Sequence, residues 1–232
     1  NSDWCDNLEA VQQVFVAIAQ AISRFERIMI VAPEVEVVRR QLMAAGVNLH
    51  QIRLVEMPTN DTWARDFGPI TVLENGQPLI LDFGFNAWGL KFAADLDNQI
   101  TSRLAQAGGF TATPVHIPGV ILEGGSIESD GNGTLLTTSN CLLSANRNPH
   151  LDRQGLEKVL GEQLGIKHFL WLHHGYLAGD DTDAHIDTLA RLCPDNTIVY
   201  VRCDDAEDEH YPELSAMKAE LRQLRTTQGE PY

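Results

Sequence analysis

A histidine and an aspartate stand two residues apart at the end of an acidic segment, Gly179–Asp187. The apolar pattern of residues 185–192 predicts a strand, and side chains two apart in a strand point to one face. His185 and Asp187 would then project together, which suits proton transfer or orientation of a substrate. The four aspartates of the segment also allow a calcium or magnesium loop, or a solvated acidic turn. The EF-hand spacing is not met, because its central glycine and final glutamate are missing.

A second segment, Asn60–Pro69, combines an aromatic residue with charges. Trp63 and Asp66 together suit a flat cation, since the ring face and the carboxylate both attract it. The simpler interpretation is a surface ion pair between Arg65 and Asp66, with Trp63 in the core. The residues alone leave both interpretations open.

The third segment is a glutamate followed by two glycines, Glu123-Gly124-Gly125. Paired glycines inside a strand pattern indicate a bulge or a close approach of another backbone. Such an approach could direct the Glu123 carboxylate inward. A solvated glutamate beside two glycines at a strand end is an equal alternative.

Composition excludes several classes of function. The chain has 232 residues and a net charge of −15, without the clustered lysine and arginine that phosphate contact requires, so we expect no nucleic-acid partner. We also expect no membrane partner and no nucleotide cofactor, because no apolar run is long enough and no glycine-rich phosphate motif is present. No metal ligands are assigned, because neither the EF-hand spacing nor a zinc-type cysteine spacing is met. The acidic field either attracts cationic ligands or only maintains solubility. Four cysteines without a C-x-x-C pair favour a reducing compartment, the cytoplasm.

The elements that must position these segments follow from periodicity and turn signals. Helices are predicted over residues 8–25, 33–45, 97–107, 151–164 and 212–224. Strands are predicted over residues 27–32, 49–57, 69–73, 78–83, 113–117, 121–129, 134–137, 168–172, 185–192 and 197–202. The Asn75-Gly76 pair predicts a hairpin turn. The order suggests repeated ββαβ units in an α/β fold rather than a Rossmann sheet, and we expect one domain over residues 1–232.

Five stretches in register resemble agmatine deiminases and the related bacterial peptidylarginine deiminases. They are W-x-R-D-x-G-P at 63–69, E-G-G at 123–125, H-x-D at 185–187, and two flanking stretches at 82–89 and 133–138. The resemblance covers nearly the whole chain, from about Trp4 onward. It implies a pentein-type α/β propeller of ββαβ units around a central pocket, incomplete in this chain.

The resemblance also implies roles for the site residues. Asp66 and Asp187 would bind the substrate guanidinium, with Trp63 as an additional substrate contact. His185 would act as general acid and then general base, and Glu123 would orient it. The implied reaction converts agmatine to N-carbamoylputrescine and ammonia, a step in putrescine synthesis, through a covalent thiouronium on a cysteine.

That cysteine is expected beyond Tyr232, so the chain is expected to be truncated at its C-terminus and inactive by itself. By the same resemblance, the chain is also expected to be truncated at its N-terminus. Cys193 and Cys203 follow His185 but lack the family pattern. Two alternatives stay open: deimination of arginine in peptides, and a non-catalytic domain that binds guanidines or polyamines. A metal-dependent hydrolase built on the acidic segment is a third class. The expected partner is a small cationic guanidine, and a homo-oligomer is expected by resemblance alone.

Overall fold

The computed structural model describes residues 4–111 and 113–232. The chain divides into two compact units, one ending at Thr62 and one running from Trp63 to Tyr232. All residues singled out for chemistry lie in the second unit. The expectation of a single domain stays a prediction.

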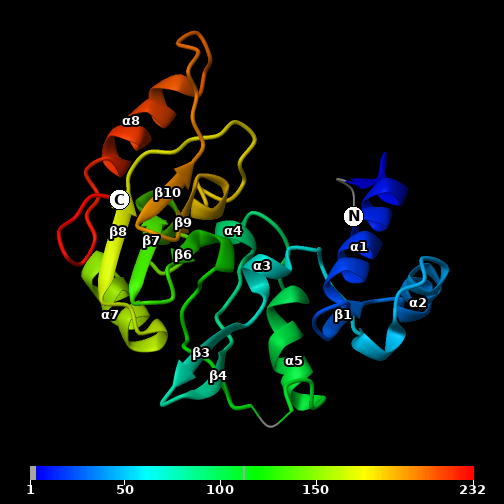
Figure 1. The fold of residues 1–232 in the computed structure, drawn as a ribbon. Helices are drawn as coiled ribbons and strands as arrows, with labels where there is room; N and C mark the ends of the chain where they lie inside the picture. Colours follow the sequence, from blue (N-terminus) through cyan, green and yellow to red (C-terminus); the bar gives the residue numbers. More distant parts are fainter. Residues whose placement is uncertain (1–3, 112) are drawn as a thin grey trace. The chain divides into compact units, whose positions relative to one another are not determined.

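The first unit is a βαβ arrangement preceded by a helix (Figure 1). It contains α1 (Leu8–Ile22), β1 (Ile28–Ala32), α2 (Val35–Ala44) and β2 (Ile52–Glu56). The two strands pair in parallel, with Ile28 opposite Ile52. Ala19 of α1 is buried in the small core, whereas the apolar stripe Phe15, Ile18 and Ile22 stays exposed. The predicted amphipathic helix is therefore present, although most of its apolar stripe does not pack in the core.

The second unit begins with a complete ββαβ unit. It consists of β3 (Ile70–Glu74), β4 (Gln77–Leu81), α5 (Ile100–Gln106) and β5 (Val115–His116). β3 and β4 are antiparallel, and their turn places Asn75 and Gly76 at positive φ, as the Asn-Gly signal predicts. β5 then returns parallel to β4.

The same arrangement repeats further along the chain. The second ββαβ unit consists of β6 (Ile127–Ser129), β7 (Thr134–Thr138), α7 (Arg153–Leu164) and β8 (His168–Leu172). β6 pairs antiparallel and β8 pairs parallel with β7. The hairpin of β9 (Ala190–Cys193) and β10 (Thr197–Tyr200), followed by α8 (Tyr211–Leu221), repeats the first three elements. The α/β class and the ββαβ rhythm are thus confirmed, while closure of the units into a propeller stays a prediction.

Two predicted strands are wrong in the places that matter most for chemistry. Residues 121–126 form no strand: Ile121 makes only an isolated parallel bridge with Gly84, and a 3-10 turn, η4 (Gly124–Ser126), precedes the short strand β6. Residues 185–189 likewise precede β9 and contain the 3-10 turn η5 (Ile186–Thr188). The sequence pattern assigned Glu123 and His185 to strands, whereas in the structure each of them directly precedes a 3-10 turn.

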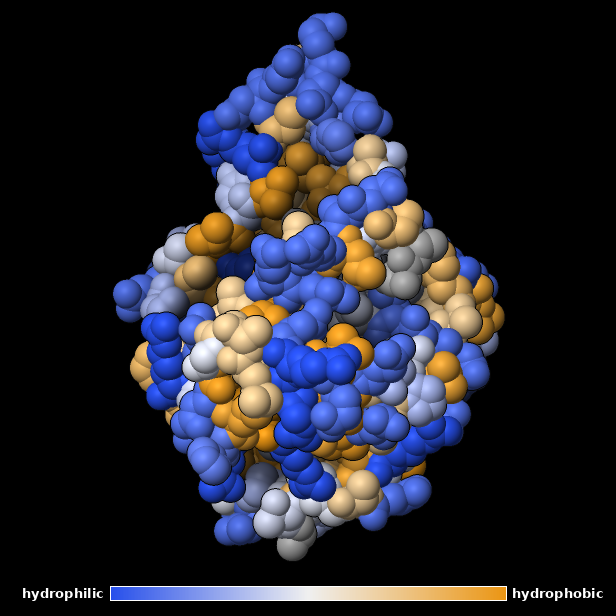
Figure 2. All heavy atoms as spheres, turned by 90° about the vertical axis from the view of Figure 1, so that its right-hand side faces the viewer, coloured by the Kyte–Doolittle hydropathy of each residue, from blue (hydrophilic) through white to orange (hydrophobic). Residues whose placement is uncertain are grey.

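The core of the second unit lies between its sheets and helices. One cluster packs α7 against β7 through Leu135, Leu156 and Leu160, and another packs α8 against β8 through Leu172 and Met217. Figure 2 shows hydrophobic atoms interspersed with hydrophilic ones on the face it presents. Across the described residues, no helix combines the length and the apolar character needed to cross a membrane.

Candidate active site

Asp66 sits on a single helical turn, α3 (Ala64–Phe67), and its side chain is buried. Its Oδ1 accepts a hydrogen bond from the Gly125 amide at 3.0 Å, and its Oδ2 accepts one from Trp88 Nε1 at 3.1 Å. Burial raises the pKa of the Asp66 carboxyl, and the nearby Asp187 carboxylate adds to this, although His185 and the two hydrogen bonds oppose it. The simpler interpretation of Asp66 as a surface partner of Arg65 is therefore wrong.

The turn that carries Asp66 ends because of a glycine. A side chain at Gly68 would place its Cβ 2.3 Å from the Ala64 carbonyl oxygen, so only glycine fits there. Trp63 precedes the turn and is 43% exposed, so it is not the core residue of the simpler interpretation. Its ring meets the Trp88 ring edge-on, with centroids 6.2 Å apart. An exposed indole therefore lies next to a buried carboxylate.

Glu123 is fully buried, as the inward orientation predicts. Arg147 Nε donates to both of its oxygens, at 3.1 Å and 2.9 Å, and His185 Nε2 lies 3.0 Å from its Oε2. Burial alone would raise the pKa of Glu123, but the hydrogen bonds and charges of His185 and Arg147 together hold the pKa below its usual value. Glu123 is therefore a charged carboxylate that faces His185.

The two glycines after Glu123 allow the close approach that their pairing predicts. A Cβ on Gly124 would lie 2.0 Å from the Arg65 carbonyl oxygen, so the α3 backbone passes directly over this residue. A Cβ on Gly125 would lie 2.6 Å from Asp66 Oδ1, 2.6 Å from His185 Nδ1 and 2.8 Å from Asp187 Oδ2. Gly125 thus marks the point where the three side chains meet.

His185 and Asp187 reach this point from the turn η5 rather than from one face of a strand. His185 is buried, with Nδ1 3.5 Å from Asp66 Oδ1 and Nε2 beside Glu123. The imidazole therefore lies between two carboxylates. The structure brings together all four residues predicted to be catalytic, Asp66, Glu123, His185 and Asp187, although the geometry that sequence reasoning invoked for the last two is wrong.

Two residues of this constellation escaped sequence reasoning. Trp88 lies in a turn with left-handed backbone, α4 (Ala87–Leu90), two residues after Asn86. Its indole N–H donates a hydrogen bond to Asp66 and so holds the carboxylate in place. The Gly89 in this stretch is the signal for an unusual backbone, but it does not indicate where the indole points. The Arg147 side chain is fully buried. It stands between Asn146 and Asn148, and a single arginine in such a polar stretch gives no signal of burial.

The acidic segment uses its carboxylates within the protein. Asp180 accepts hydrogen bonds from the backbone of Thr182 and Ala184, and Asp183 forms ion pairs with Lys91 and Arg147. This arrangement accounts for two of its aspartates without a metal ion. Among the described residues, Glu123, Cys141 and His185 offer ligand atoms within 4.8 Å of one another, but the Arg147 guanidinium already occupies the Glu123 oxygens.

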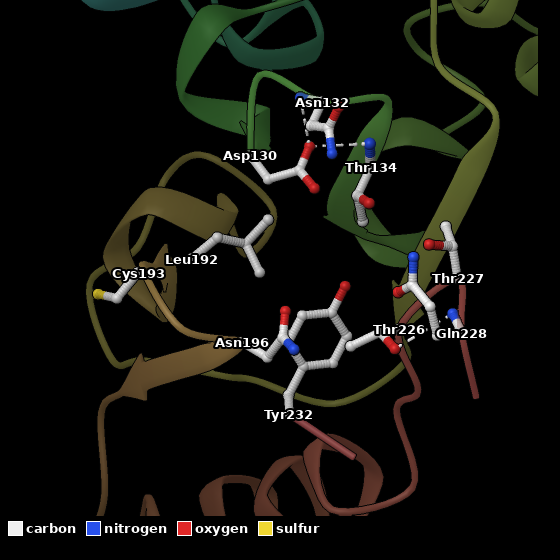
Figure 3. A pocket seen from close by; sticks show the side chains of 10 residues that line it. All are labelled: Asp130, Asn132, Thr134, Leu192, Cys193, Asn196, Thr226, Thr227, Gln228 and Tyr232. Carbon is white, nitrogen blue, oxygen red and sulfur yellow. Dashed lines mark hydrogen bonds between the residues drawn. The ribbon is translucent and has the colours of Figure 1, made fainter. Parts of the chain in front are cut away.

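None of the three thiols in the second unit, Cys141, Cys193 and Cys203, faces the meeting point at Gly125 with the properties of a nucleophile. Cys141 is buried with its Sγ 3.6 Å from Glu123 Oε2, and burial raises its pKa well above the usual value, an effect that the Glu123 charge reinforces. Cys193 lines a separate pocket of about 100 Å³ that also contains Tyr232, and Figure 3 shows its sulfur turned away from that ring. Cys203 Sγ lies 3.5 Å from the Asp205 carbonyl.

Chemically, the constellation offers two carboxylates and a buried imidazole around one small volume, with the exposed Trp63 indole against the Trp88 ring that fixes Asp66. Two carboxylates can each accept paired N–H donors from a planar cation and fix its orientation. An imidazole held against a charged glutamate can exchange protons with such a ligand. The arrangement therefore favours a guanidinium or amidinium ligand over a neutral or anionic one.

Comparison with known proteins points the same way. The family model described as Porphyromonas-type peptidyl-arginine deiminase matches residues 1–232. An agmatine deiminase of Stutzerimonas stutzeri is 38% identical over 98% of this chain. The chain spans 62% of that relative's length.

Solved structures share the fold over nearly the whole chain. A crystal structure described as a candidate peptidyl-arginine deiminase superposes with a TM-score of 0.91 at 42% identity, covering 99% of this chain and 68% of that one. A Cys-to-Ser variant of C. jejuni agmatine deiminase with substrate bound superposes with a TM-score of 0.86 at 40% identity, covering 99% of this chain and 66% of that one.

Proposed function

The chain belongs to the Porphyromonas-type peptidyl-arginine deiminase family, and from this premise we propose that the protein hydrolyses agmatine to N-carbamoylputrescine and ammonia. The observation that carries the proposal is the convergence of Asp66, His185 and Asp187 on Gly125, with Glu123 behind the imidazole. The agmatine deiminases among its relatives support the choice of substrate.

In this proposal the two aspartates bind the guanidinium. Asp187 is only partly buried and accepts from one side, whereas Asp66, held by Gly125 and Trp88, accepts from the other. Burial raises the pKa of Asp66, and a bound guanidinium would lower this pKa again because a positive charge stabilises the ionised carboxylate. Trp63 contacts the Trp88 ring, whose indole fixes Asp66, and we propose that it covers the aliphatic part of the ligand.

His185 acts as the proton carrier. It protonates the departing ammonia and then accepts a proton from the water that hydrolyses the covalent intermediate. The charged Glu123 keeps the imidazole oriented and stabilises it while it is protonated. Each step therefore uses a group that is already aimed at the meeting point.

The attacking group of this reaction is a cysteine thiolate. Cys141 does not fit, because its pKa is raised and it lies beside Glu123 rather than at Gly125. Cys193 Sγ lies 4.0 Å from the Arg191 carbonyl within β9, and Cys203 Sγ lies 3.5 Å from the Asp205 carbonyl. We propose that a cysteine outside residues 1–232 supplies this thiolate, as the resemblance to the family implies. A cytoplasmic location and a homo-oligomeric state stay predictions.

Ammonia release from agmatine tests the proposal. It is measured with the 232-residue chain and with the protein expressed from its complete gene. Turnover only in the latter supports both the reaction and the external nucleophile. Turnover by the chain alone would contradict the external nucleophile, and Cys141→Ala, Cys193→Ala and Cys203→Ala variants would then identify the thiol.

Deimination of arginine in peptides is the second candidate, favoured by the description of the family model. The same assay with a peptide containing one internal arginine separates the two reactions. Faster turnover of the peptide than of agmatine would replace the proposed substrate. Agmatine binding without turnover in the complete protein would instead favour a non-catalytic guanidine-binding domain.

A further inference from the structure

A chain of alternating charges leads from a half-exposed lysine to the buried Glu123. Lys91 Nζ lies 2.6 Å from Asp183 Oδ1, Arg147 Nη1 lies 2.7 Å from Asp183 Oδ2, and Arg147 Nε lies 2.9 Å from Glu123 Oε2. The Lys91 and Asp183 side chains are 35% and 33% exposed, whereas Arg147 and Glu123 are fully buried. We refer to Lys91, Asp183 and Arg147 as the ion network.

The ion network connects two segments whose backbone is strained. The first is the turn Ala87–Leu90, in which four consecutive residues have positive φ between 51° and 81°. Residues with a Cβ disfavour this left-handed conformation, and a run of them is rare. This turn carries Trp88, whose indole fixes Asp66.

The second strained segment directly precedes the proposed proton carrier. Asp183 and Ala184 have φ of 66° and 67°, and His185 follows them. Arg147 Nη2 donates to the Thr182 carbonyl at 3.0 Å, while Thr138 Oγ1 donates to the Ala184 carbonyl at 2.8 Å. Strained backbone of this kind persists only where surrounding contacts determine it.

Contacts from one short loop and from Lys91 hold both segments. Asn86, at the start of the left-handed turn, donates its side-chain amide to the Asn146 carbonyl at 2.8 Å, one residue before Arg147. At the end of the turn, Lys91 Nζ also donates to the Asp181 carbonyl at 2.7 Å. The turn bearing Trp88 and the segment preceding His185 are therefore joined directly by Lys91 and indirectly through the loop that carries Arg147.

We propose that Lys91 is a positioning residue of the site, which acts through Asp183 and Arg147 to hold Trp88 and His185 in register. A half-exposed ion pair contributes little to overall stability. A displacement of a site residue by about 1 Å, in contrast, can reduce a reaction rate about a hundredfold. Lys91 therefore matters for the placement of Asp66 and His185 more than for folding. Only the substrate measurement below depends on the proposed function.

The first test follows the Trp88 indole without any ligand. Its N–H donates to the buried Asp66, so it should exchange slowly with solvent in the unmodified chain. Hydrogen exchange of the indole N–H is measured by ¹⁵N NMR, with the resonance assigned from Trp88→Phe. Lys91→Met should speed this exchange at least tenfold. Lys158→Met, the same change at an exposed lysine on α7, should leave it unchanged.

The second test is a double-mutant cycle on agmatine affinity in the protein expressed from its complete gene. Lys91→Met should weaken binding about tenfold. The same substitution in a Trp88→Phe background should cause a smaller further loss, because Lys91 acts in part through Trp88. Unchanged indole exchange in Lys91→Met, or fully additive losses in the cycle, would overturn the proposal. If the unmodified protein does not bind agmatine, the proposed function fails, while the exchange experiment still decides the role of Lys91.

Discussion

Replacing Gly125 by alanine places a methyl group at the point where the site residues meet. The new Cβ would lie 2.6 Å from Asp66 Oδ1 and from His185 Nδ1, and 2.8 Å from Asp187 Oδ2. A carbon atom needs a separation of about 3.5 Å from such atoms. Each of the three groups must therefore move outward by roughly 0.7–0.9 Å, as that contact distance requires.

The cost of this movement falls on the site more than on the fold. The obstructing atoms are side-chain ends, and the φ of Gly125 is not in the left-handed region, so we expect overpacking to cost about 1–3 kcal/mol of stability. The displacement of the two carboxylates and the imidazole should lower turnover of agmatine about a hundredfold.

Two other glycines supply the controls, Gly124 beside Gly125 and Gly155 on α7. Gly124→Ala would place its Cβ 2.0 Å from the Arg65 carbonyl oxygen, which belongs to the backbone, so this variant should lose more stability than Gly125→Ala. Gly155→Ala in the first turn of α7 meets only side-chain atoms at 3.3 Å and should leave stability and turnover close to those of the unmodified protein.

Urea unfolding and ammonia release together provide the assay, using the protein expressed from its complete gene. The expected pattern is a small stability loss with a large activity loss for Gly125→Ala. Unchanged turnover and unchanged agmatine affinity in Gly125→Ala would refute the reasoning, because the meeting point at Gly125 would then not be the binding site.

Three further predictions concern buried groups of the same site. Cys141→Ala should keep agmatine turnover within about threefold in the complete protein while losing about 1–2 kcal/mol of stability to the cavity it leaves; complete loss of turnover would make Cys141 the nucleophile. Glu123→Gln should cost about 3 kcal/mol near pH 7, since it breaks a buried ion pair with Arg147. The pKa of Glu123 is lower in the folded state than in the unfolded state, so the ionised carboxylate stabilises the fold at pH values above the ordinary glutamate pKa of 4.5. This stabilisation should be lost as the pH falls below about 4.5. Midpoints of urea unfolding across the acid range check this. The pKa of Asp66 is higher in the folded state than in the unfolded state, so the buried carboxyl is favourable when it is protonated. This contribution to stability is complete below about pH 4 and is lost as the pH rises through the pKa of Asp66 in the folded state. The unmodified chain should therefore lose stability relative to Asp66→Asn between pH 4 and neutrality, and a constant difference would contradict the burial argument.

The regular elements were predictable because their patterns are local. Apolar runs mark the strands β1 and β8, and helical spacing marks α7. The Asn75-Gly76 turn follows from backbone preferences of these two residues alone. The succession of these elements was enough to indicate the repeated ββαβ units.

The geometry of the site was predictable only in part. The order of the motifs identified Asp66, Glu123, His185 and Asp187. Their convergence depends on the turns η4 and η5, and the apolar residues around these turns led to the prediction of strands instead. Periodicity cannot distinguish an extended buried segment that pairs with a neighbour from one that does not.

Arg147 and Trp88 were unpredictable for a different reason. Arg147 is buried because carboxylates distant in sequence, Glu123 and Asp183, neutralise it in the folded chain. Trp88 reaches Asp66 through a left-handed turn that local preferences oppose. Both placements arise from tertiary contacts between residues that are far apart in the sequence, and local sequence patterns do not predict such contacts.

Calorimetric titration with agmatine and putrescine tests most directly the central claim that Asp66 and Asp187 bind a guanidinium. Putrescine retains an amine but lacks the guanidinium, and Asp187→Asn removes one carboxylate from a partly exposed position. In the 232-residue chain, which we predict not to turn agmatine over, agmatine should bind at least tenfold more tightly than putrescine, and Asp187→Asn should abolish most of this preference. Equal affinities for the two ligands, or an agmatine preference that survives in Asp187→Asn, would contradict the claim.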